Sequence, residues 1–322
     1  MIVFHGPGEI PAGFGPSVVA IGKFDGVHSG HRAVIDRARV AAAETGARVV
    51  AVTFDRNPLS LLRPEACPEP LASLSQNLDR LADAGVDATL VLRFDEALAA
   101  LEPRAFVEHV LVDALGVSDV LVGDDFRFGR RGAGDPALLA ELGRAYGFTV
   151  EVVGDVEGGG RRVSSTWIRD LLSAGDVEDA ARLLGRPHAL EGEVVHGLQR
   201  GRELGFPTAN LSPDAEGFVP ADGVYAGWLV DHGTGATRAD TAVTTTRYPA
   251  AISVGTNPTF DDVPVRQVEA YALDQTGIDL YGHRVDVEFT HRIRGMVAFE
   301  GVDALIAQMT DDVARVRAAL GA

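Results

Sequence analysis

The sequence predicts an α/β domain with a parallel sheet, followed by a domain of short antiparallel strands. In the first half of the chain, short apolar runs alternate with helical segments, a pattern typical of βαβ units. In the second half, shorter and often alternating runs are separated by Gly, Pro and Asp, which is typical of an antiparallel barrel or sandwich. The length of 322 residues also favours two domains, at about 150 residues for each.

The elements of the first half follow one another as strand and helix. Buried strands are expected at 17–21, 48–54, 88–92, 119–122 and 148–153. Helices are expected at 32–43, 74–84, 103–115, 136–146, 167–173 and 177–184. The last helix ends at Gly185-Arg186-Pro187, and glycine followed closely by proline commonly ends a helix. We therefore place the boundary there, with one domain at residues 1–187 and the other at 188–322.

The second domain is expected to contain short strands and one long helix. The strands are expected at 191–195, 223–230, 251–254, 267–273 and 285–290. The polar stretch 231–246 reads as a loop or an irregular hairpin. The chain closes with an amphipathic helix at 302–320.

Charge and composition exclude several classes of protein. The net charge is −17, and broad nucleic-acid binding needs a cationic surface instead. Cys67 is the single cysteine, which excludes a disulfide framework and a cysteine-based zinc site. No apolar run is long enough for a transmembrane helix, and residues 1–11 lack the pattern of a signal peptide. We expect a cytoplasmic protein, monomeric or weakly self-associating, without nucleic-acid or membrane partners.

A glycine-rich loop with two histidines links the first strand to the first helix. It reads Gly22-Lys23-Phe24-Asp25-Gly26-Val27-His28-Ser29-Gly30-His31. A helix N-terminus offers free N–H groups and a positive dipole, and glycines let a ligand approach the backbone. His28 and His31 share a face if the helix begins near His28. The loop therefore suits a triphosphate, although no P-loop or GxGxxG fingerprint is present. The residues expected around ATP are Gly22, Phe24, Asp25 and Gly30.

The HxGH element at His28–His31 resembles the nucleotidyltransferase superfamily, which transfers an adenylyl group from ATP to a phosphate acceptor. The run Ser164-Ser165-Thr166-Trp167-Ile168-Arg169 is similar to the superfamily's late motif. Hydroxyl groups and amides at a helix start can hold phosphates, which assigns Ser164, Ser165 and Thr166 to ATP. Arg169 can neutralise the charge that develops on the leaving pyrophosphate. The resemblance implies a Rossmann-like fold with His28, His31 and Arg169 in catalytic roles.

Two later loops carry aromatic and acidic residues. Residues 53–58 close the second strand, and residues 123–129 close a later one. Ligands of open α/β sheets bind at the carboxyl ends of strands, so both loops are candidate parts of a site. Their phenylalanines suit contact with a flat ring or ordinary core packing, and their acidic residues suit ligand or metal binding or a turn. The candidate residues are Phe54, Asp55, Asn57, Asp125, Phe126 and Phe128.

The second domain contains a long and unusual string. It reads Gly201-Arg202-Glu203-Leu204-Gly205-Phe206-Pro207-Thr208-Ala209-Asn210. Its glycines and arginines, Gly201 and Arg202 among them, suit a flexible segment that covers phosphates. Thr208 and Asn210 are two apart, so their side chains share one side of an extended segment. Both carry oxygens suitable for Mg²⁺, which prefers oxygen ligands beside substrate phosphates.

This string resembles the riboflavin kinase domain, as do residues 220–227, 253–260 and 268–271. The resemblance implies a β-barrel with a terminal helix, Mg²⁺ on Thr208 and Asn210, and Glu269 as the catalytic base. Nearly the whole chain is similar to the bacterial bifunctional riboflavin kinase/FMN adenylyltransferase family, often called FAD synthetase. The second domain would then make FMN and ADP from riboflavin and ATP. The first would make FAD and pyrophosphate from FMN and ATP, with the flavin bound by the two loops above.

The chain departs from the family's pattern at a few positions. Arg56-Asn57-Pro58 stands where the family usually has Pro-His-Pro. Asn57 can still donate a hydrogen bond, and Arg56 adds a cation near the expected FMN phosphate. His188 replaces a common tyrosine, and Tyr271 follows the predicted base where histidine is more usual.

Three alternatives to the bifunctional enzyme remain at this point. One is a riboflavin kinase whose first domain is weakened or altered in its substrate. Another is a flavin-binding regulatory protein without turnover. The third is an adenylyltransferase for pantetheine phosphate or nicotinate mononucleotide, which the riboflavin kinase half disfavours.

Overall fold

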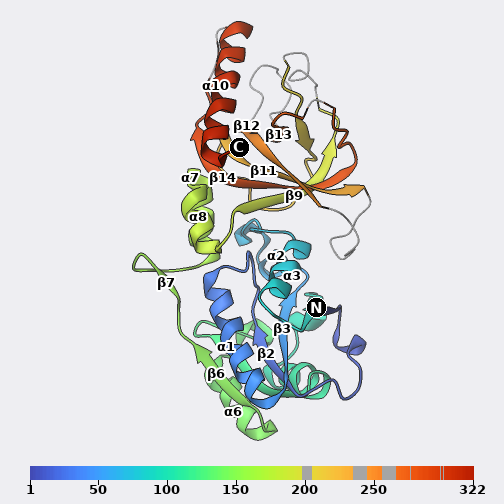
Figure 1. Ribbon diagram of the computed structural model, residues 1–322. Helices are drawn as coiled ribbons and strands as arrows, with labels where there is room; N and C mark the ends of the chain where they lie inside the picture. Colours follow the sequence, from blue (N-terminus) through green and yellow to red (C-terminus); the bar gives the residue numbers. More distant parts are fainter. Residues whose placement is uncertain (198–204, 235–244, 256–265, 276, 298, 300) are drawn as a thin grey trace. The chain divides into compact units, whose positions relative to one another are not determined.

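The computed structural model describes the chain except for residues 198–204, 235–244, 256–265, 276, 298 and 300 (Figure 1). Its contacts divide the chain into two compact units. The first consists of Met1–Glu69 and Leu74–Ser164, and the second of Pro70–Ser73 and Ser165–Ala322. Among the described residues, no helix is both long and apolar enough to cross a membrane.

Six parallel strands form the sheet of the first unit, which confirms the predicted fold class. Their order is β1-β4-β3-β2-β5-β6. Three predicted strands have the expected bounds, and the other two differ by one or two residues at their ends. The edge strand β1, which pairs with β4, is not in the prediction. The strands are β1 (Ile2–Phe4), β2 (Ser17–Ile21), β3 (Arg48–Phe54), β4 (Ala88–Leu92), β5 (Val117–Gly123) and β6 (Thr149–Val153).

Alternate side chains of the central strands pack into cores on the two faces of the sheet. Val18 and Ala20 of β2 belong to a core with Ile35 of α1 (Ser29–Thr45). Val19 and Ile21 point into the core on the opposite face. That core contains helices α5 (Pro103–Phe106) and α6 (Pro136–Tyr146), together with the π-helical segment η3 (Val107–Ala114). A strand buried on both faces explains why β2 reads as an uninterrupted apolar run.

The other elements of the first unit are short, apart from α3 (Leu74–Asp83). The predicted helix 103–115 is divided, because α5 continues into the wider turns of η3, which keep Val107, Val110 and Leu111 buried. A small hairpin of β7 and β8 follows β6. The short elements are η1 (Pro7–Glu9), α2 (Leu59–Leu62), η2 (Pro64–Ala66), α4 (Glu96–Ala99), η4 (Arg130–Gly132), β7 (Glu157–Gly158) and β8 (Arg161–Arg162).

The second unit is a closed antiparallel barrel, in the order β10-β13-β12-β11-β14-β9. This settles the choice between barrel and sandwich. Strand β10 is absent from the prediction, and β11 extends through Thr234 into the stretch expected as a loop. The terminal helix α10 (Val302–Leu320) has the predicted bounds and packs on β11, β12 and β14. The strands are β9 (His188–Val195), β10 (Ala209–Leu211), β11 (Gly223–Thr234), β12 (Thr246–Gly255), β13 (Gln267–Ala272) and β14 (His283–Arg294).

Two helices that precede the barrel in sequence pack with it. Helix α7 (Ser165–Ala174) contacts α8 (Val177–Leu184), which packs on β9 and β14. Arg292 of β14 donates hydrogen bonds to the carbonyl oxygens of Ala174, at 2.7 Å, and Asp222, at 3.2 Å. By packing, the division of the chain therefore falls at Ser164/Ser165. The predicted functional boundary near residue 187 stays a prediction.

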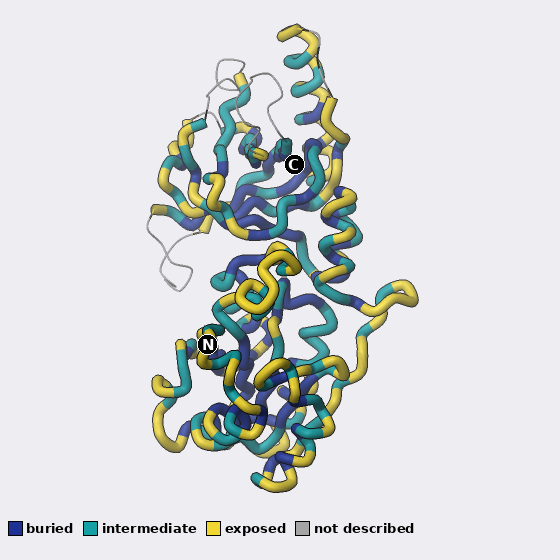
Figure 2. Tube along the Cα trace, turned by 180° about the vertical axis from the view of Figure 1, so that it is seen from behind, coloured by how far each residue is buried: buried dark blue, intermediate teal, exposed yellow. Residues whose placement is uncertain are grey.

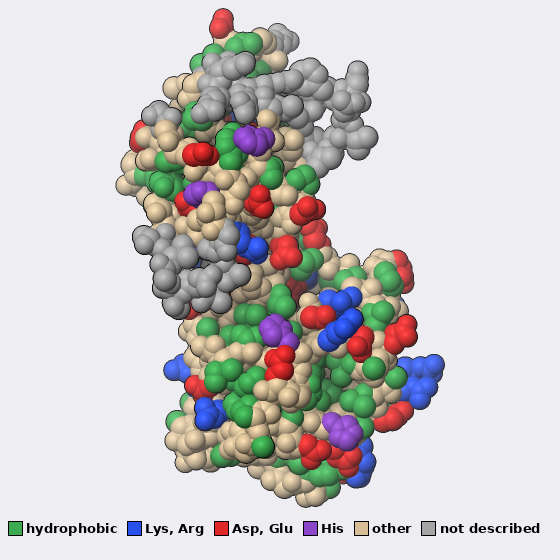
Figure 3. Space-filling model, turned by 90° about the vertical axis from the view of Figure 1, so that its right-hand side faces the viewer, with side chains coloured by type: hydrophobic (Ala, Val, Ile, Leu, Met, Phe, Trp, Pro, Cys, Tyr) green, Lys and Arg blue, Asp and Glu red, His purple; other side chains and the backbone are tan. Residues whose placement is uncertain are grey.

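The buried residues lie mainly in the strands of the parallel sheet and of the barrel. Figure 2 shows the buried stretches concentrated in the strands of the sheet and of the barrel. On the face drawn in Figure 3, acidic and basic side chains of the described residues are interspersed, without a broad basic area. This distribution agrees with the acidic balance of the sequence.

Candidate functional site

The first candidate site lies where the strand order of the parallel sheet reverses. From β2 the chain continues through β3 to β4 on one side, and then crosses to β5 and β6 on the other. The carboxyl ends of strands at such a reversal form the usual ligand crevice of open α/β sheets. The loop with His28 follows β2, and residues 124–129 follow β5. The predicted nucleotide loop and one predicted flavin loop are therefore neighbours.

The two histidines lie together at the start of α1. His28 is the residue before the helix and is 6% exposed, and His31 is in the first helical turn. Their rings are stacked, with centroids 3.7 Å apart and planes at 19°. The prediction that they share a face is confirmed. The pair stands beside the N–H groups and positive dipole of a helix of 17 residues.

Gly30 and Phe24 have packing roles that the sequence did not indicate. A Cβ on Gly30 would lie 3.1 Å from Cε1 of His28, so the histidine ring fills the space that a side chain would take. Phe24 is 2% exposed, lies edge-on to His31 at 5.3 Å and belongs to the α1 core. The Phe24 ring is therefore part of the core, and its predicted contact with ATP stays a prediction. Gly22 and Asp25 lie in the loop itself.

The loop after β3 is held by its own polar residues. Asp55 accepts a hydrogen bond from the backbone N–H of Phe94 at 2.8 Å and pairs with Arg56 at 3.3 Å. The Asn57 side-chain oxygen accepts from the N–H of Leu59 at 3.1 Å, which forms an Asx turn before α2. Phe54, the last residue of β3, is partly buried against the core. Asp55 and Asn57 therefore shape the loop, and their predicted contact with a flavin stays a prediction.

The loop after β5 combines a buried and an accessible phenylalanine. Phe128 is 6% exposed and packs in the core, so it is a structural residue. Phe126 stacks on it, with centroids 5.5 Å apart, and is partly exposed. Asp125 is exposed and pairs with Arg162 at 2.9 Å, and the same guanidinium reaches Asp155 at 2.9 Å. Arg162 thus links the β7–β8 hairpin to this loop, a contact that the sequence did not indicate.

The late Ser/Thr motif straddles the division between the units. Ser164 is the last residue of the first unit, and Ser165–Arg169 form the first half of α7 in the second. The expected helix is present but begins two residues earlier, at Ser165, so Ser165 and Thr166 lie in its first turn rather than ahead of it. The phosphate-binding roles of Ser164, Ser165 and Thr166 and the catalytic role of Arg169 stay predictions.

The second candidate site lies on adjacent strands of the barrel. Asn210 of β10 pairs directly with Glu269 of β13. The Thr208 hydroxyl donates a hydrogen bond to Oε2 of Glu269 at 3.2 Å. The Asn210 amide nitrogen donates to the carbonyl oxygen of Thr208 at 3.2 Å and to its hydroxyl oxygen at 3.4 Å. The structure therefore brings all three residues predicted for kinase chemistry together. Gly201 and Arg202 lie outside the described residues.

Burial makes Glu269 a stronger base than an ordinary glutamate. Desolvation raises the pKa of its carboxyl group, and the hydrogen bond from Thr208 lowers it by a smaller amount. A carboxylate with a raised pKa takes up a proton more readily, which suits general-base catalysis near neutral pH. Thr208 also holds one carboxylate oxygen, Oε2, in place.

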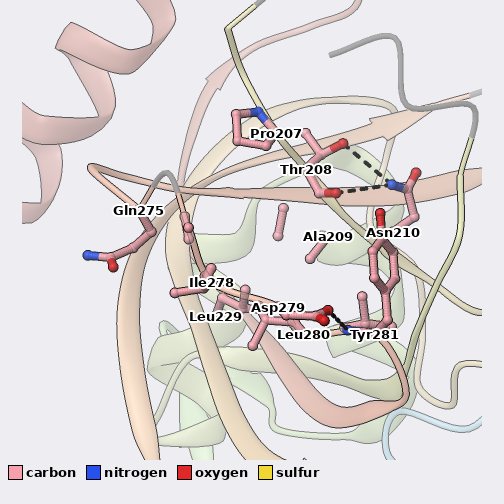
Figure 4. Close-up of a pocket in the computed structure, with 14 residues that line it drawn as sticks. Pro207, Thr208, Ala209, Asn210, Leu229, Gln275, Ile278, Asp279, Leu280 and Tyr281 are labelled. Carbon is pink, nitrogen blue, oxygen red and sulfur yellow. Dashed lines mark hydrogen bonds between the residues drawn. The ribbon is translucent and has the colours of Figure 1, made fainter. Parts of the chain in front are cut away.

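A cavity of about 280 Å³ opens beside this group (Figure 4). Thr208 and Asn210 form a polar end of it, and Val194, Leu229 and Leu280 contribute apolar walls. Tyr281 stands near Asn210 in Figure 4, whereas Gln275 points away from the other labelled residues. The segment 277–281 supplies one wall, and none of its residues was among the predicted site residues, although Leu280-Tyr281-Gly282 fits the pattern of the riboflavin kinase family. The cavity is lined by Val194, Pro207, Thr208, Ala209, Asn210, Leu229, Ala270, Ala272, Gln275, Gly277, Ile278, Asp279, Leu280 and Tyr281.

Family models match both halves of the chain. Residues 12–167 match the FAD synthetase family, and residues 184–320 match riboflavin kinase. A crystal structure described as a macrolide-efflux protein from Streptococcus pneumoniae is 32% identical, with a TM-score of 0.82 and 98% of each chain covered. That name differs from the names of the two families, and the likeness shows a common fold over the full length.

Curated relatives carry both activities in their names. The bifunctional riboflavin kinase/FMN adenylyltransferase of Pseudomonas fluorescens is 38% identical over 301 residues, which cover 94% of this chain and 92% of the relative. The protein of the same name from Escherichia coli (strain K12) is 37% identical over 304 residues, covering 94% and 93%. Together with the two family matches, these relatives confirm the predicted family. The chain belongs to the bifunctional riboflavin kinase/FMN adenylyltransferase family.

Proposed function

We propose that the protein makes FAD from riboflavin in two steps, with each step assigned to particular residues. The barrel transfers a phosphoryl group from ATP to riboflavin and gives FMN and ADP. The parallel-sheet unit joins FMN to the adenylyl group of a second ATP and gives FAD and pyrophosphate. Membership of the family and the presence of both matched regions support the pair of reactions. The residue roles below are our assignments.

Glu269 acts as the general base of the kinase step. The riboflavin 5′-hydroxyl oxygen attacks the γ-phosphorus of ATP, its proton passes to Glu269, and ADP leaves. The single observation that carries this assignment is the group formed by Thr208, which directly precedes β10, Asn210 of β10 and Glu269 of β13. Its only ionisable member is the half-buried Glu269, whose Oε2 accepts a hydrogen bond from the Thr208 hydroxyl at 3.2 Å.

The donor set beside Glu269 fits Mg²⁺. Thr208 offers a hydroxyl oxygen and Asn210 an amide oxygen, and Mg²⁺ prefers such ligands together with substrate phosphates. The amide nitrogen of Asn210 now faces Thr208, and a half-turn of the amide places the oxygen there. When bound, the ion supplies positive charge that offsets the charge of the ATP phosphates. The two side chains would hold that charge next to the base.

The cavity suits the adenine base of ATP better than the flavin. One polar end is the pair Thr208 and Asn210, which we assign to the phosphates, and the walls beyond them are mainly apolar, with Gln275, Asp279 and Tyr281 as further polar members. A nucleotide whose phosphates lie at the polar end would extend its base between those walls. Apolar walls with a few polar groups are typical of sites for flat organic ligands.

His28 and His31 act in the adenylyl step by holding and neutralising phosphate oxygens. The FMN phosphate attacks the α-phosphorus of ATP directly, and pyrophosphate leaves, so no covalent enzyme intermediate is needed. The helix N-terminus supports this role through its N–H groups. Arg169 is assigned to the developing charge of pyrophosphate, and Arg56 with Asn57 to the FMN phosphate. Catalysis then rests on in-line positioning and charge stabilisation.

Two variants test the assignment of each step to its own residues. We expect Glu269→Gln to lower the rate of FMN formation from riboflavin by about 10²–10⁴-fold while FAD still forms from supplied FMN. His31→Ala should show the reverse pattern. Loss of both reactions in either variant, with the fold intact by circular dichroism, would contradict the division. FMN formation without FAD in the wild-type protein would favour a kinase with a weakened first unit, and flavin binding without products a regulatory protein.

The acidic surface and the family support the remaining expectations for partners. We propose a cytoplasmic enzyme with riboflavin, FMN, FAD and ATP as ligands and without nucleic-acid or membrane partners. It would be monomeric or weakly self-associating. Light scattering over a range of protein concentrations, with and without ATP and Mg²⁺, measures the mass that decides this last point.

A further inference from the structure

One wall of the barrel cavity is a short segment between β13 and β14. Residues 277–281 line the cavity, and Tyr281 is the member nearest to β14. The segment belongs to no helix or strand, so the internal pattern of a regular element does not hold it in place. Its position must come from specific contacts with the barrel.

Backbone bonds hold the end of this segment. The N–H of Gly282 donates to the carbonyl oxygen of Val194 on β9 at 2.9 Å, and the N–H of His283 donates to the carbonyl oxygen of Leu280 at 2.9 Å. The side chain of Asp279 accepts from the N–H of Tyr281 at 3.2 Å. The segment therefore closes as a tight turn immediately before β14 begins.

A histidine–aspartate pair joins this turn to β11. Nδ1 of His283 lies 2.9 Å from Oδ1 of Asp231, and a carboxylate can only accept, so the ring nitrogen is the donor. Asp231 is itself oriented by the N–H of Gly233 at 2.8 Å. The side chains of Asp231 and His283 are 14% and 23% exposed, so water competes little for the bond. His283 thus ties the first residue of β14 to a strand that also contributes Leu229 to the cavity.

A second histidine holds the aromatic ring of the wall. The rings of His196 and Tyr281 are stacked, with centroids 3.8 Å apart and planes at 30°. His196 is exposed and follows directly after β9, whereas Tyr281 lines the cavity. The stacking contact with His196 therefore restricts the orientation of the Tyr281 ring in the cavity wall.

We propose that His283 with Asp231, and His196 through its stack on Tyr281, are positioning residues that set the affinity of the kinase site for ATP. His283 fixes the backbone of the cavity wall, and His196 fixes the face that Tyr281 presents to the nucleotide base. This inference rests on the assignment of the cavity to adenine under the proposed function. Neither histidine touches the reacting atoms, so the effect falls on ATP binding rather than on the phosphoryl step.

Paired variants of each histidine test the proposal in the full-length protein. His283→Ala removes the bond to Asp231, whereas His283→Asn keeps a donor near the position of Nδ1. His196→Ala removes the stack, whereas His196→Phe keeps a flat ring. His109→Ala is the matched control, because His109 also pairs with an aspartate but lies on η3 of the other unit. Initial rates of FMN formation give KM for ATP and for riboflavin separately.

The two alanine variants should raise KM for ATP about ten-fold, as expected for the loss of an interaction of moderate strength, and leave kcat and KM for riboflavin nearly unchanged. His283→Asn and His196→Phe should restore most of the affinity. An unchanged KM for ATP in a folded His196→Ala variant, in which only an exposed side chain is removed, would overturn the proposal. So would a rise in KM for riboflavin instead. An active Glu269→Gln variant measured alongside would contradict the kinase mechanism itself.

Discussion

Replacement of Glu269 by glutamine separates the chemistry of the barrel from its stability. The substitution keeps the size of the side chain and its ability to accept a bond from Thr208, but it removes the group that takes the proton. A general base typically contributes about 10²–10⁴-fold to a rate, so FMN formation should fall by that factor. This corresponds to about 3–5 kcal/mol of transition-state stabilisation, at about 1.4 kcal/mol for each factor of ten.

The thermal midpoint of the same variant should rise or stay unchanged, even though its activity falls. Burial raises the pKa of the Glu269 carboxyl group, so the folded state binds its proton more tightly than the unfolded state does. Above that raised pKa the ionised carboxylate costs stability, and the cost disappears as the pH falls through it. Glutamine carries no charge, so at pH 7 the thermal midpoint of the variant should equal or exceed that of the wild-type protein.

The assay is FMN formation from riboflavin and ATP, with thermal unfolding followed on the same samples. Glu193→Gln is the matched control, because Glu193 is an exposed glutamate on the barrel strand β9. The control should retain full activity. A Glu269→Gln variant with more than about a tenth of the wild-type rate would refute the reasoning. So would a variant that is inactive because its thermal midpoint has fallen.

Three further substitutions test other parts of the structure. Gly30→Ala places a Cβ 3.1 Å from the His28 ring, so the rate of adenylyl transfer to FMN should fall about a hundred-fold while the rate of FMN formation stays unchanged. An adenylyl transfer rate equal to that of the wild-type protein would contradict the stacked arrangement of the histidines. Arg56→Ala should raise KM for FMN about ten-fold without changing KM for ATP, and an unchanged KM would remove Arg56 from the phosphate site. Gly175→Ala, at a φ of +79° and 2.5 Å from the Arg292 guanidinium, should lower the free energy of unfolding by about 1–2 kcal/mol in urea titrations, whereas no loss would argue against that contact.

The sequence predicted the regular elements of the sheet because their patterns are local. β2 and β3 are runs of apolar residues buried on both faces, and each has the expected bounds. β1 and β10 were missed because three residues are too few to show a period. The packing of α7 and α8 with the barrel was also unpredictable, since it depends on Arg292, more than a hundred residues away.

In the candidate sites too, geometry within a short stretch of sequence could be predicted, whereas contacts between distant residues could not. The stacked pair His28 and His31 is encoded in four consecutive residues, so its geometry could be expected from the motif and the start of α1. The hydrogen bond between Thr208 and Glu269 joins residues 61 apart, and only the resemblance to a family placed them together. The pairing of Asp231 with His283 carries no motif and spans 52 positions, so it required the fold.

The most direct test of the bifunctional assignment is a chromatographic time course of the wild-type protein. Purified protein is incubated with riboflavin, excess ATP and Mg²⁺, and riboflavin, FMN and FAD are separated and measured together. The account predicts that FMN appears first and is then converted to FAD, with release of ADP in the first step and pyrophosphate in the second. FMN that accumulates without FAD, or riboflavin that stays unconverted, would contradict it.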